Sequence, residues 1–274
     1  MKFPRLVASA ACAVSLSAAA ITAATTPAYA SSTNYVALGD SYSSGNGAGS
    51  YDGSSCERSS NAYAPKWAAA HSPASFSFVA CSGATTADVR NNQLSALNAS
   101  TTLASITIGG NDAGFANVMQ TCVLSSDSTC VSAVNSAENT MRTTLPGRLS
   151  SLYSAMRAKS PSARFVVLDY PHLYIITSFC VGLSNTKRNA LNAAADVLDG
   201  VISTAASNAG FTFADVRNQF KGHELCSGDD WLNSVTWPIG DSYHPTALGQ
   251  SSGYLPVFTS AAGSALARSH AKDS

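Results

Sequence analysis

Residues 35–45 read YVALGDSYSSG, and this stretch sets the expected fold. Its first four residues are apolar and partly β-branched, which is typical of a short buried strand. Gly39 ends the strand, so Ser41 stands where it gives way to a turn or to the start of a helix. Open α/β sheets bind ligands at this end of their strands, and a free hydroxyl there can take part in chemistry. The alternative is that Ser41 serves only as a helix N-cap, which Gly-Asp-Ser suits well.

Four more apolar runs of strand length follow, and stretches with helical spacing separate them. Because strands and helices alternate, we expect a five-stranded parallel sheet with helices on both faces. No linker or repeat divides the chain, which predicts one α/β domain over residues 31–274, a three-layer α/β/α sandwich. The further strands are expected at 76–81, 103–108, 164–169 and 211–216, with a small loop at 122–130 and irregular structure at 217–243. The helices are expected at 61–71, 85–99, 131–159 with an interruption at Pro146, 184–209 and 245–268.

The first 30 residues have the pattern of a secretory signal peptide. Lys2 and Arg5 form a short basic segment, residues 6–24 are apolar and alanine-rich, and the AYA at residues 28–30 is a small-x-small cleavage site. A membrane anchor is the alternative, but Ser and Thr interrupt the apolar run and the cleavage motif follows it directly. We therefore expect residues 1–30 to be removed, and the protein to be secreted without a stable membrane anchor.

Without the signal peptide the chain carries two more acidic than basic residues, and only 12% of the whole sequence is charged. No basic stripe runs along it, so nucleic acid is not an expected partner. Ser, Thr, Asn and Ala abound instead. This composition favours a secreted protein whose surface is polar but carries few charges.

Six cysteines remain once Cys12 leaves with the signal peptide. An even number of cysteines in a secreted chain indicates disulfides. Six cysteines allow 15 pairings, and we choose the pairing of nearest neighbours. A zinc site is the alternative, but there is no Cys-x-x-Cys pair and no histidine at ligand spacing from a cysteine pair, so we expect no metal. The chosen pairs are Cys56–Cys81, Cys122–Cys130 and Cys180–Cys226.

Small polar clusters follow three of the predicted strands. They are GDS at residues 39–41, CSG at 81–83 and GGND at 109–112. The carboxyl ends of parallel strands meet at one edge of a sheet, so these clusters should lie close together. Late in the chain, DSYHP at residues 241–245 adds a histidine.

These clusters contain the parts of a serine hydrolase site. A hydroxyl nucleophile needs a base, a group that orients the base, and donors for an oxyanion. Ser41 can be the nucleophile and His244 the base, while the amides of Ser41 and Gly83 and the side chain of Asn111 can be the donors. Taken singly, Gly83 and Asn111 can be turn residues, and His172 is a rival base because it follows a strand. Four such pieces in chain order are much less expected by chance than any one of them.

The same four clusters resemble the sequence blocks of the SGNH (GDSL) hydrolases. GDSY at residues 39–42 is similar to the first block, Gly83 fits the second, GGND at 109–112 the third, and D-x-x-HP at 241–245 the fifth. With the six cysteines, the resemblance is greatest to secreted lipases, esterases and phospholipases of Streptomyces type. It implies a flavodoxin-like sandwich, the SGNH hydrolase fold, with an acyl-enzyme formed on Ser41 and no cofactor. The G-x-S-x-G elbow of the α/β-hydrolases is absent.

Asp241 lies three residues before His244, where the acid of the family usually stands. A carboxylate there would fix the imidazole tautomer and stabilise the imidazolium. In some secreted relatives a backbone carbonyl just before the histidine does this instead, and Ser242 or Asp241 can supply one. We favour the carboxylate and keep the carbonyl as the alternative.

The expected substrate is a small-molecule or lipid ester outside the cell. Apolar residues after the strands, namely Phe115, Val118, Met119 and residues 174–179, either line an acyl groove or belong to the core. We predict a monomeric secreted lipase or esterase, phospholipase activity included, that prefers medium or long acyl chains to acetylated sugars. The alternatives are a carbohydrate acetyl-esterase with the same site and a non-catalytic binding protein on the same fold.

Overall fold

A computed structural model describes residues 33–270, so the expected signal peptide lies outside the described residues. Five parallel strands form one sheet in the spatial order β2-β1-β3-β4-β5. From β1 the chain passes to β2 at one edge of the sheet, and it then crosses back to add β3, β4 and β5 on the other side of β1. The connections after β1 and β3 therefore diverge, which opens a crevice at their carboxyl ends. The strands are β1 (Asn34–Gly39), β2 (Ser75–Phe78), β3 (Leu103–Thr107), β4 (Arg164–Leu168) and β5 (Thr212–Ala214).

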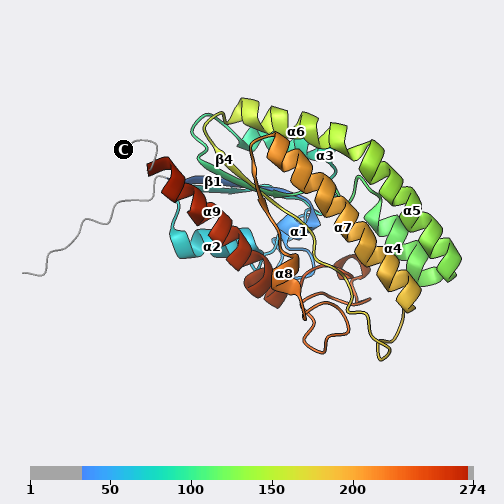
Figure 1. The fold of residues 1–274 in the computed structure, drawn as a ribbon. Helices are drawn as coiled ribbons and strands as arrows, with labels where there is room; N and C mark the ends of the chain where they lie inside the picture. Colours follow the sequence, from blue (N-terminus) through green and yellow to red (C-terminus); the bar gives the residue numbers. More distant parts are fainter. Residues whose placement is uncertain (1–32, 271–274) are drawn as a thin grey trace, which may run out of the picture.

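Helices cover both faces of the sheet, as the sequence predicts. On one side lie α2 (Tyr63–His71) and α9 (Leu255–His270), and on the other lie α6 (Leu145–Lys159) and α7 (Asn185–Asn208) (Figure 1). Tyr35 of β1 shows how the first layer is held, because its ring stacks on Phe258 of α9 with centroids 5.4 Å apart. Its hydroxyl group is also satisfied, by Ser105 Oγ of β3 at 2.7 Å. The three-layer α/β/α sandwich is thus confirmed.

The strands differ in burial according to their place in the sheet. All of β3 and nearly all of β1 are buried, as continuous apolar runs covered on both faces should be. The two edge strands β2 and β5 expose part of their length. The strands predicted at 76–81 and 211–216 are therefore longer than those observed, and their apolar content did not reveal that they lie at the edges of the sheet.

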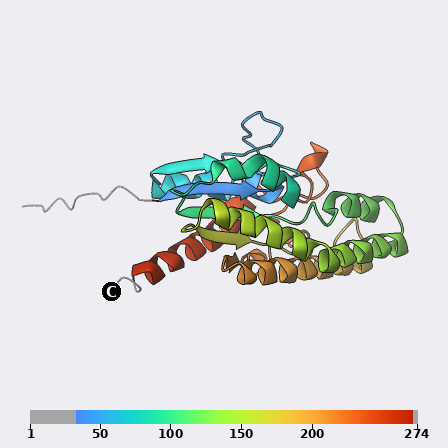
Figure 2. The ribbon, with the colours of Figure 1, turned by 90° about the horizontal axis from the view of Figure 1, so that it is seen from above.

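Two helices extend beyond the carboxyl edge of the sheet, α4 (Phe115–Leu124) and α5 (Asp127–Thr143), together with the first part of α7 (Figure 2). The small loop predicted at residues 122–130 is wrong, since most of this stretch is helical. Ser126 lies between the two helices, and its side chain caps α5 by accepting from the Thr129 amide at 3.3 Å. The helical stretch predicted at 131–159 is divided between α5 and α6, close to the interruption expected at Pro146, which lies in the first turn of α6, where no amide donor is needed.

Short elements complete the fold. The helices predicted at 85–99 and 245–268 are present, but each begins or continues with irregular helical turns. The segment predicted to be irregular, 217–243, contains only short helices. The short elements of the whole fold are α1 (Ser41–Ser44), α3 (Thr86–Asp88), α8 (Arg217–Phe220), the π-helical η1 (Val89–Gln93) and η4 (Gly249–Tyr254), and the 3₁₀-helical η2 (Leu94–Ala96) and η3 (Ile239–Asp241).

The structure joins the six cysteines in the three pairs chosen from the sequence. Cys56–Cys81 holds the loop after α1 against the end of β2, and Cys122–Cys130 joins α4 to α5. Cys180–Cys226 ties the loop after β4 to the loop after α8. Two of the three bonds thus fasten loops that leave the carboxyl edge of the sheet. None of the helices in residues 33–270 is long and apolar enough to cross a membrane.

Candidate active site

Ser41 is the first residue of α1, directly beyond the end of β1. Gly39 makes this tight turn possible, because its φ of +122° suits glycine and a Cβ there would collide with the Thr107 carbonyl oxygen. Asp40 caps the helix by accepting from the Tyr42 amide at 3.0 Å. The capping role that the sequence left open for Ser41 therefore belongs to Asp40, and the Ser41 hydroxyl group is available to bond elsewhere.

The imidazole of His244 lies against that hydroxyl group. Its Nε2 is 2.7 Å from Ser41 Oγ, and its Nδ1 is 3.0 Å from the carbonyl oxygen of Ser242. A carbonyl oxygen can only accept, so Nδ1 carries the proton and Nε2 is left to accept from the serine hydroxyl. His244 is half-buried, and the withdrawal of its ring from water lowers the pKa of the imidazole to about 4. The ring is therefore neutral near pH 7, as a proton acceptor must be.

The Asp241 carboxylate is engaged away from the imidazole. It accepts from the Tyr51 hydroxyl group at 2.9 Å, and this hydroxyl group in turn accepts from the Gly47 amide at 2.8 Å. Both ring nitrogens of His244 already have other partners. The geometry thus favours the alternative that the sequence left open, in which the carbonyl of Ser242 orients the ring. Asp241 instead joins the histidine loop to the loop that follows α1.

The rival base is engaged with a different partner. His172 Nε2 is 2.9 Å from the carboxylate of Asp196 on α7, and Arg217 bonds the same carboxylate at 2.7 Å. This cluster lies outside the cavity that contains Ser41 and His244. The structure therefore places His244, and not His172, beside the serine.

The two candidate oxyanion residues besides Ser41 lie on neighbouring loops. Asn111 Nδ2 donates to the Ala84 carbonyl at 3.0 Å, which leaves its second N–H available. The side chain of the next residue, Asp112, is buried, and its carboxylate accepts from the amide and the hydroxyl of Thr86 at 2.8 and 2.7 Å. These bonds fasten the loop that carries Gly83 to the loop that carries Asn111. With Ser41 and His244, both residues line one open cavity of about 590 Å³.

A buried network beneath Ser41 was not predicted. The Asp40 carboxylate accepts from Thr107 Oγ1 at 2.7 Å and from the hydroxyl group of Tyr170, which accepts in turn from the Gly110 amide at 3.2 Å. Burial raises the pKa of Asp40 to about 6, although these hydrogen bonds act in the opposite direction. Tyr170 thus connects the loops that carry Ser41 and Asn111. The position of Tyr170 just after a predicted strand was the one available signal in the sequence.

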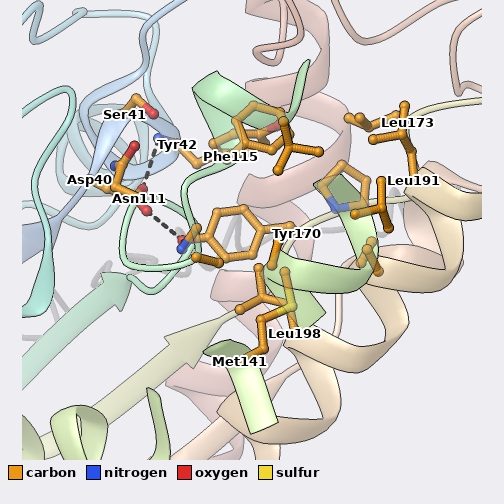
Figure 3. A pocket seen from close by; sticks show the side chains of 18 residues that line it. Asp40, Ser41, Tyr42, Asn111, Phe115, Met141, Tyr170, Leu173, Leu191 and Leu198 are labelled. Atoms are coloured by element: carbon orange, nitrogen blue, oxygen red, sulfur yellow. Dashed lines mark hydrogen bonds between the residues drawn. The ribbon is translucent and has the colours of Figure 1, made fainter. Parts of the chain in front are cut away.

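A second, narrow cavity of about 60 Å³ leads from Ser41 into the apolar layer between α4, α5 and α7 (Figure 3). Of the apolar residues singled out from the sequence, Phe115 and Val118 line it, whereas Met119 lines the open cavity. Ile176 and Phe179 are exposed, at 44% and 93%. No residue of the stretch 174–179 lines the narrow cavity, and Tyr174 is buried in the core, as the second alternative expected. The deeper walls include Met141, Leu191, Ala194 and Leu198, whose contribution required α4, α5 and α7 to be placed first.

Among the described residues, no group of three or more His, Cys, Asp or Glu side chains is arranged to hold a metal ion. The Ser41 hydroxyl group bonds an imidazole nitrogen, and Gly83 and the side-chain amide of Asn111 line the same cavity. This set suits proton transfer and the stabilisation of a negatively charged oxygen.

Comparisons with known proteins agree with this geometry. A model of the GDSL-like lipase/acylhydrolase family matches residues 37–251. Lipase 1 of Streptomyces coelicolor is 56% identical, over 90% of this chain and 92% of that lipase. Among solved structures, phospholipase A1 from Streptomyces albidoflavus superposes with a TM-score of 0.82 at 59% identity, and the extracellular lipase of Streptomyces rimosus does so with 0.82 at 53%. Each match covers 84% of this chain and 99% of the other. The chain therefore belongs to the GDSL-like lipase/acylhydrolase family and is a carboxylic ester hydrolase of that type.

Proposed function

We propose that this protein is a secreted lipase or phospholipase in which Ser41 is the nucleophile and His244 the general base. The hydrogen bond between Ser41 Oγ and His244 Nε2 carries the proposal. It unites residues 203 positions apart in the chain, in a cavity that also contains two further oxyanion donors. The Ser242 carbonyl completes the arrangement by holding Nδ1–H, which makes this a serine–histidine pair supported by the main chain.

The reaction proceeds through an acyl-enzyme. His244 Nε2 takes the hydroxyl proton while Ser41 Oγ attacks the ester carbonyl carbon, and the carbonyl oxygen becomes an oxyanion. The amides of Ser41 and Gly83 and the side chain of Asn111 donate to that oxygen. The imidazolium then gives its proton to the leaving alcohol, which departs and leaves the acyl group on Oγ. Water, deprotonated by Nε2, attacks the acyl carbon. The bond between that carbon and Oγ then breaks, the imidazolium returns its proton to Oγ, and the carboxylic acid is released.

The acyl chain of the substrate occupies the narrow apolar cavity. This cavity begins at Ser41 and Asn111 and continues between apolar side chains such as Phe115 and Leu198. A straight hydrocarbon chain suits such a space, whereas a sugar ring would leave its hydroxyl groups without hydrogen-bond partners. The open cavity on the other side of Ser41 then receives the alcohol part of the ester. The names of the relatives, lipase and phospholipase A1, support a lipid ester.

Replacement of the nucleophile tests the site. We expect Ser41→Ala to abolish ester hydrolysis, with a loss on the order of 10⁶-fold in kcat by comparison with other serine hydrolases. The variant should stay folded, because the substitution removes only one oxygen atom. An organophosphonate should label Ser41 of the wild-type protein, as read from the mass of its peptide. Labelling at another residue, or an active alanine variant, would contradict the assignment.

Profiling of acyl chain length tests the substrate class. We expect octanoyl and longer esters to be cleaved faster than acetyl esters, and Ala194→Leu, which fills the narrow cavity, to remove that preference. Ala193 is the next residue on α7 but is exposed, so Ala193→Leu is the matched control and should keep the wild-type profile. A wild-type preference for acetyl over octanoyl esters would favour a carbohydrate acetyl-esterase instead.

We further propose that the protein acts outside the cell as a monomer, after removal of residues 1–30. The support is the basic, apolar and AYA pattern of this segment, the three disulfides and an extracellular relative. N-terminal sequencing of the protein recovered from culture medium should begin at Ser31. A sequence that begins at Met1 would contradict cleavage.

A further inference from the structure

Six large apolar side chains are more than half exposed among those that the structure describes. All six come from three segments, which are the end of α4, the loop after β4 and the loop before η3 with η3 itself. The most exposed are a phenylalanine, a valine and a tryptophan, at 93%, 96% and 87%. We call these residues the apolar rim: Leu124, Phe179, Val181, Val235, Trp237 and Ile239.

The apolar rim is continuous with the mouth of the active site. Leu124, Val235 and Ile239 line the same open cavity as Ser41 and His244. Val235 also lines the adjacent cavity, together with Val181. The rim thus borders the entrance through which an ester must reach the serine.

Two of the three segments are held together by covalent and backbone bonds. The Cys180–Cys226 disulfide ties the loop after β4 to the loop after α8, and the Ile175 amide donates to the Leu225 carbonyl at 3.0 Å. Figure 1 shows these loops, yellow and orange, on the same lower edge of the molecule. Two of the three rim segments are therefore anchored loops, and they carry five of its six exposed side chains.

Exposed apolar groups of this size indicate a partner, because a soluble protein gains nothing from keeping them in water. The charged side chains that line the two cavities are few and of both signs: Glu57 lines the open cavity, and Lys187 and Asp230 line the adjacent one. Asp241, at the end of η3, adds one further carboxylate. A partner that matches this border is apolar and carries no strong net charge. A protein seated on the rim would cover the entrance to Ser41, whereas a lipid surface would deliver the substrate to it.

We propose that the apolar rim docks this enzyme onto a neutral or zwitterionic lipid surface, with the mouth of the active site facing the lipid. This inference rests on the proposed function, since it presumes a lipid ester as substrate. Apolar side chains that enter the interface gain the free energy of leaving water, and anionic lipid is not required. Docking then presents acyl esters to the narrow cavity without prior transfer through water.

Trp237 provides a direct measurement of docking. The other two tryptophans, Trp67 and Trp231, are 6% and 7% exposed, so a change in emission on binding reports Trp237. Wild-type protein is mixed with vesicles of dialkyl ether phosphatidylcholine, which has no ester to cleave. We expect a blue shift of the emission and co-sedimentation of the protein with the vesicles. Failure to bind, or binding only to phosphatidylglycerol vesicles with loss at high salt, would overturn the proposal.

A pair of rate measurements separates this proposal from the proposed function. The double variant Phe179→Ser/Trp237→Ser should cleave dissolved p-nitrophenyl butyrate within about twofold of the wild-type rate, but cleave vesicle phosphatidylcholine or emulsified triglyceride at least tenfold more slowly. Leu248→Ser is the matched control, because Leu248 is 47% exposed and lies outside the rim; it should resemble the wild type on each substrate. Equal rates of the double variant and the wild type on aggregated lipid would overturn docking. A wild-type protein inert on the dissolved ester would instead count against the proposed function.

Discussion

Beneath Ser41 the site is buried and densely hydrogen-bonded, whereas around its mouth it is apolar and open to water. We call the lower region the floor; it comprises the residues just after the strand ends, namely Asp40, Ser41, Asn111 and Tyr170. Within it, the single carboxylate of Asp40 accepts from a backbone amide and two hydroxyl groups. On the apolar rim, Val235, Trp237 and Ile239 are exposed by 53%, 87% and 62%. The floor is fixed by strand ends and the rim by loops.

This difference suggests a division of roles within one active site. Groups that stabilise charge in the transition state must be held in place before reaction, and buried hydrogen bonds do this. Groups that meet an apolar surface need exposure and gain little from hydrogen bonds. Changes in the floor should therefore reduce kcat on every ester, whereas changes on the rim should depend on the physical state of the substrate.

The most severe test of the floor is Asn111→Ala. It removes one proposed oxyanion donor, and we expect kcat to fall by about 10²–10³-fold on dissolved and aggregated esters alike, as for other oxyanion holes. KM should change little, because the interaction strengthens in the transition state. Steady-state kinetics on p-nitrophenyl butyrate and on an emulsified ester measure both quantities.

The control for this variant separates oxyanion stabilisation from loop anchoring, since Asn111 also bonds the Ala84 carbonyl. Thr86→Val removes the hydroxyl bond to Asp112 that anchors the same loop, but leaves the Asn111 amide in place. We expect it to lower kcat by less than about tenfold, well below the loss for an oxyanion donor. Equal losses in the two variants would mean that Asn111 acts mainly as a loop anchor.

The pH profile gives the next largest effect, because burial lowers the pKa of His244 from 6.5 to about 4. At pH 5 about 90% of such an imidazole is neutral, against about 3% of an imidazole with an ordinary pKa. The acid limb of kcat/KM should accordingly lie near pH 4, so that activity at pH 5 stays within about twofold of that at pH 7. A limb near 6.5 would contradict the shift.

The pKa of Asp40 also lies between 4 and 6.5, so its titration must be distinguished from that of His244. Its pKa is raised from 3.8 to about 6, so between these values the native state binds more protons here than the unfolded state, and this contribution to stability is lost as pH rises. His244 acts oppositely, because its lowered pKa costs stability as pH falls from 6.5 to about 4. The two contributions partly cancel, so activity is the better measurement. Asp40→Asn cannot titrate, and its acid limb should stay near 4 if His244 sets it.

The sequence was sufficient to predict those floor residues that lie directly after strand ends. Small polar residues directly after β1 and β3 had to meet at one edge once the sheet was parallel. This argument brought Ser41 and Asn111 together without any side-chain geometry. It could not supply Tyr170, because a tyrosine after a strand looks the same whether it faces the core or bonds a carboxylate.

The sequence was less informative about the walls and the rim. The narrow cavity depends on α4, for which no helix was predicted although Phe115, Val118, Met119 and Cys122 have helical spacing, and on how α4, α5 and α7 pack beyond the sheet. Residues 174–179 looked suited to an acyl groove because they are apolar, but apolar character does not distinguish a buried wall from an exposed rim. Phe179 shows the difference, since it is 93% exposed.

Asp241 lies at the boundary between floor and rim, and its replacement should have the smallest effect. Its carboxylate bonds Tyr51, and the amide oxygen of an asparagine can accept the same hydrogen bond, so Asp241→Asn should keep the loop in place. The Ser242 carbonyl that orients His244 is unchanged, and we therefore expect kcat near neutral pH to fall by tenfold or less, against about 10⁴ where a triad aspartate is lost. The negative charge of Asp241 raises the pKa of His244, so its removal should move the acid limb to lower pH.

Tyr51→Phe is the matched control, because it breaks the same link between the loops but keeps the carboxylate. A loss of three decades in Asp241→Asn alone would mean that the carboxylate turns to His244 during reaction and that the floor extends to this loop.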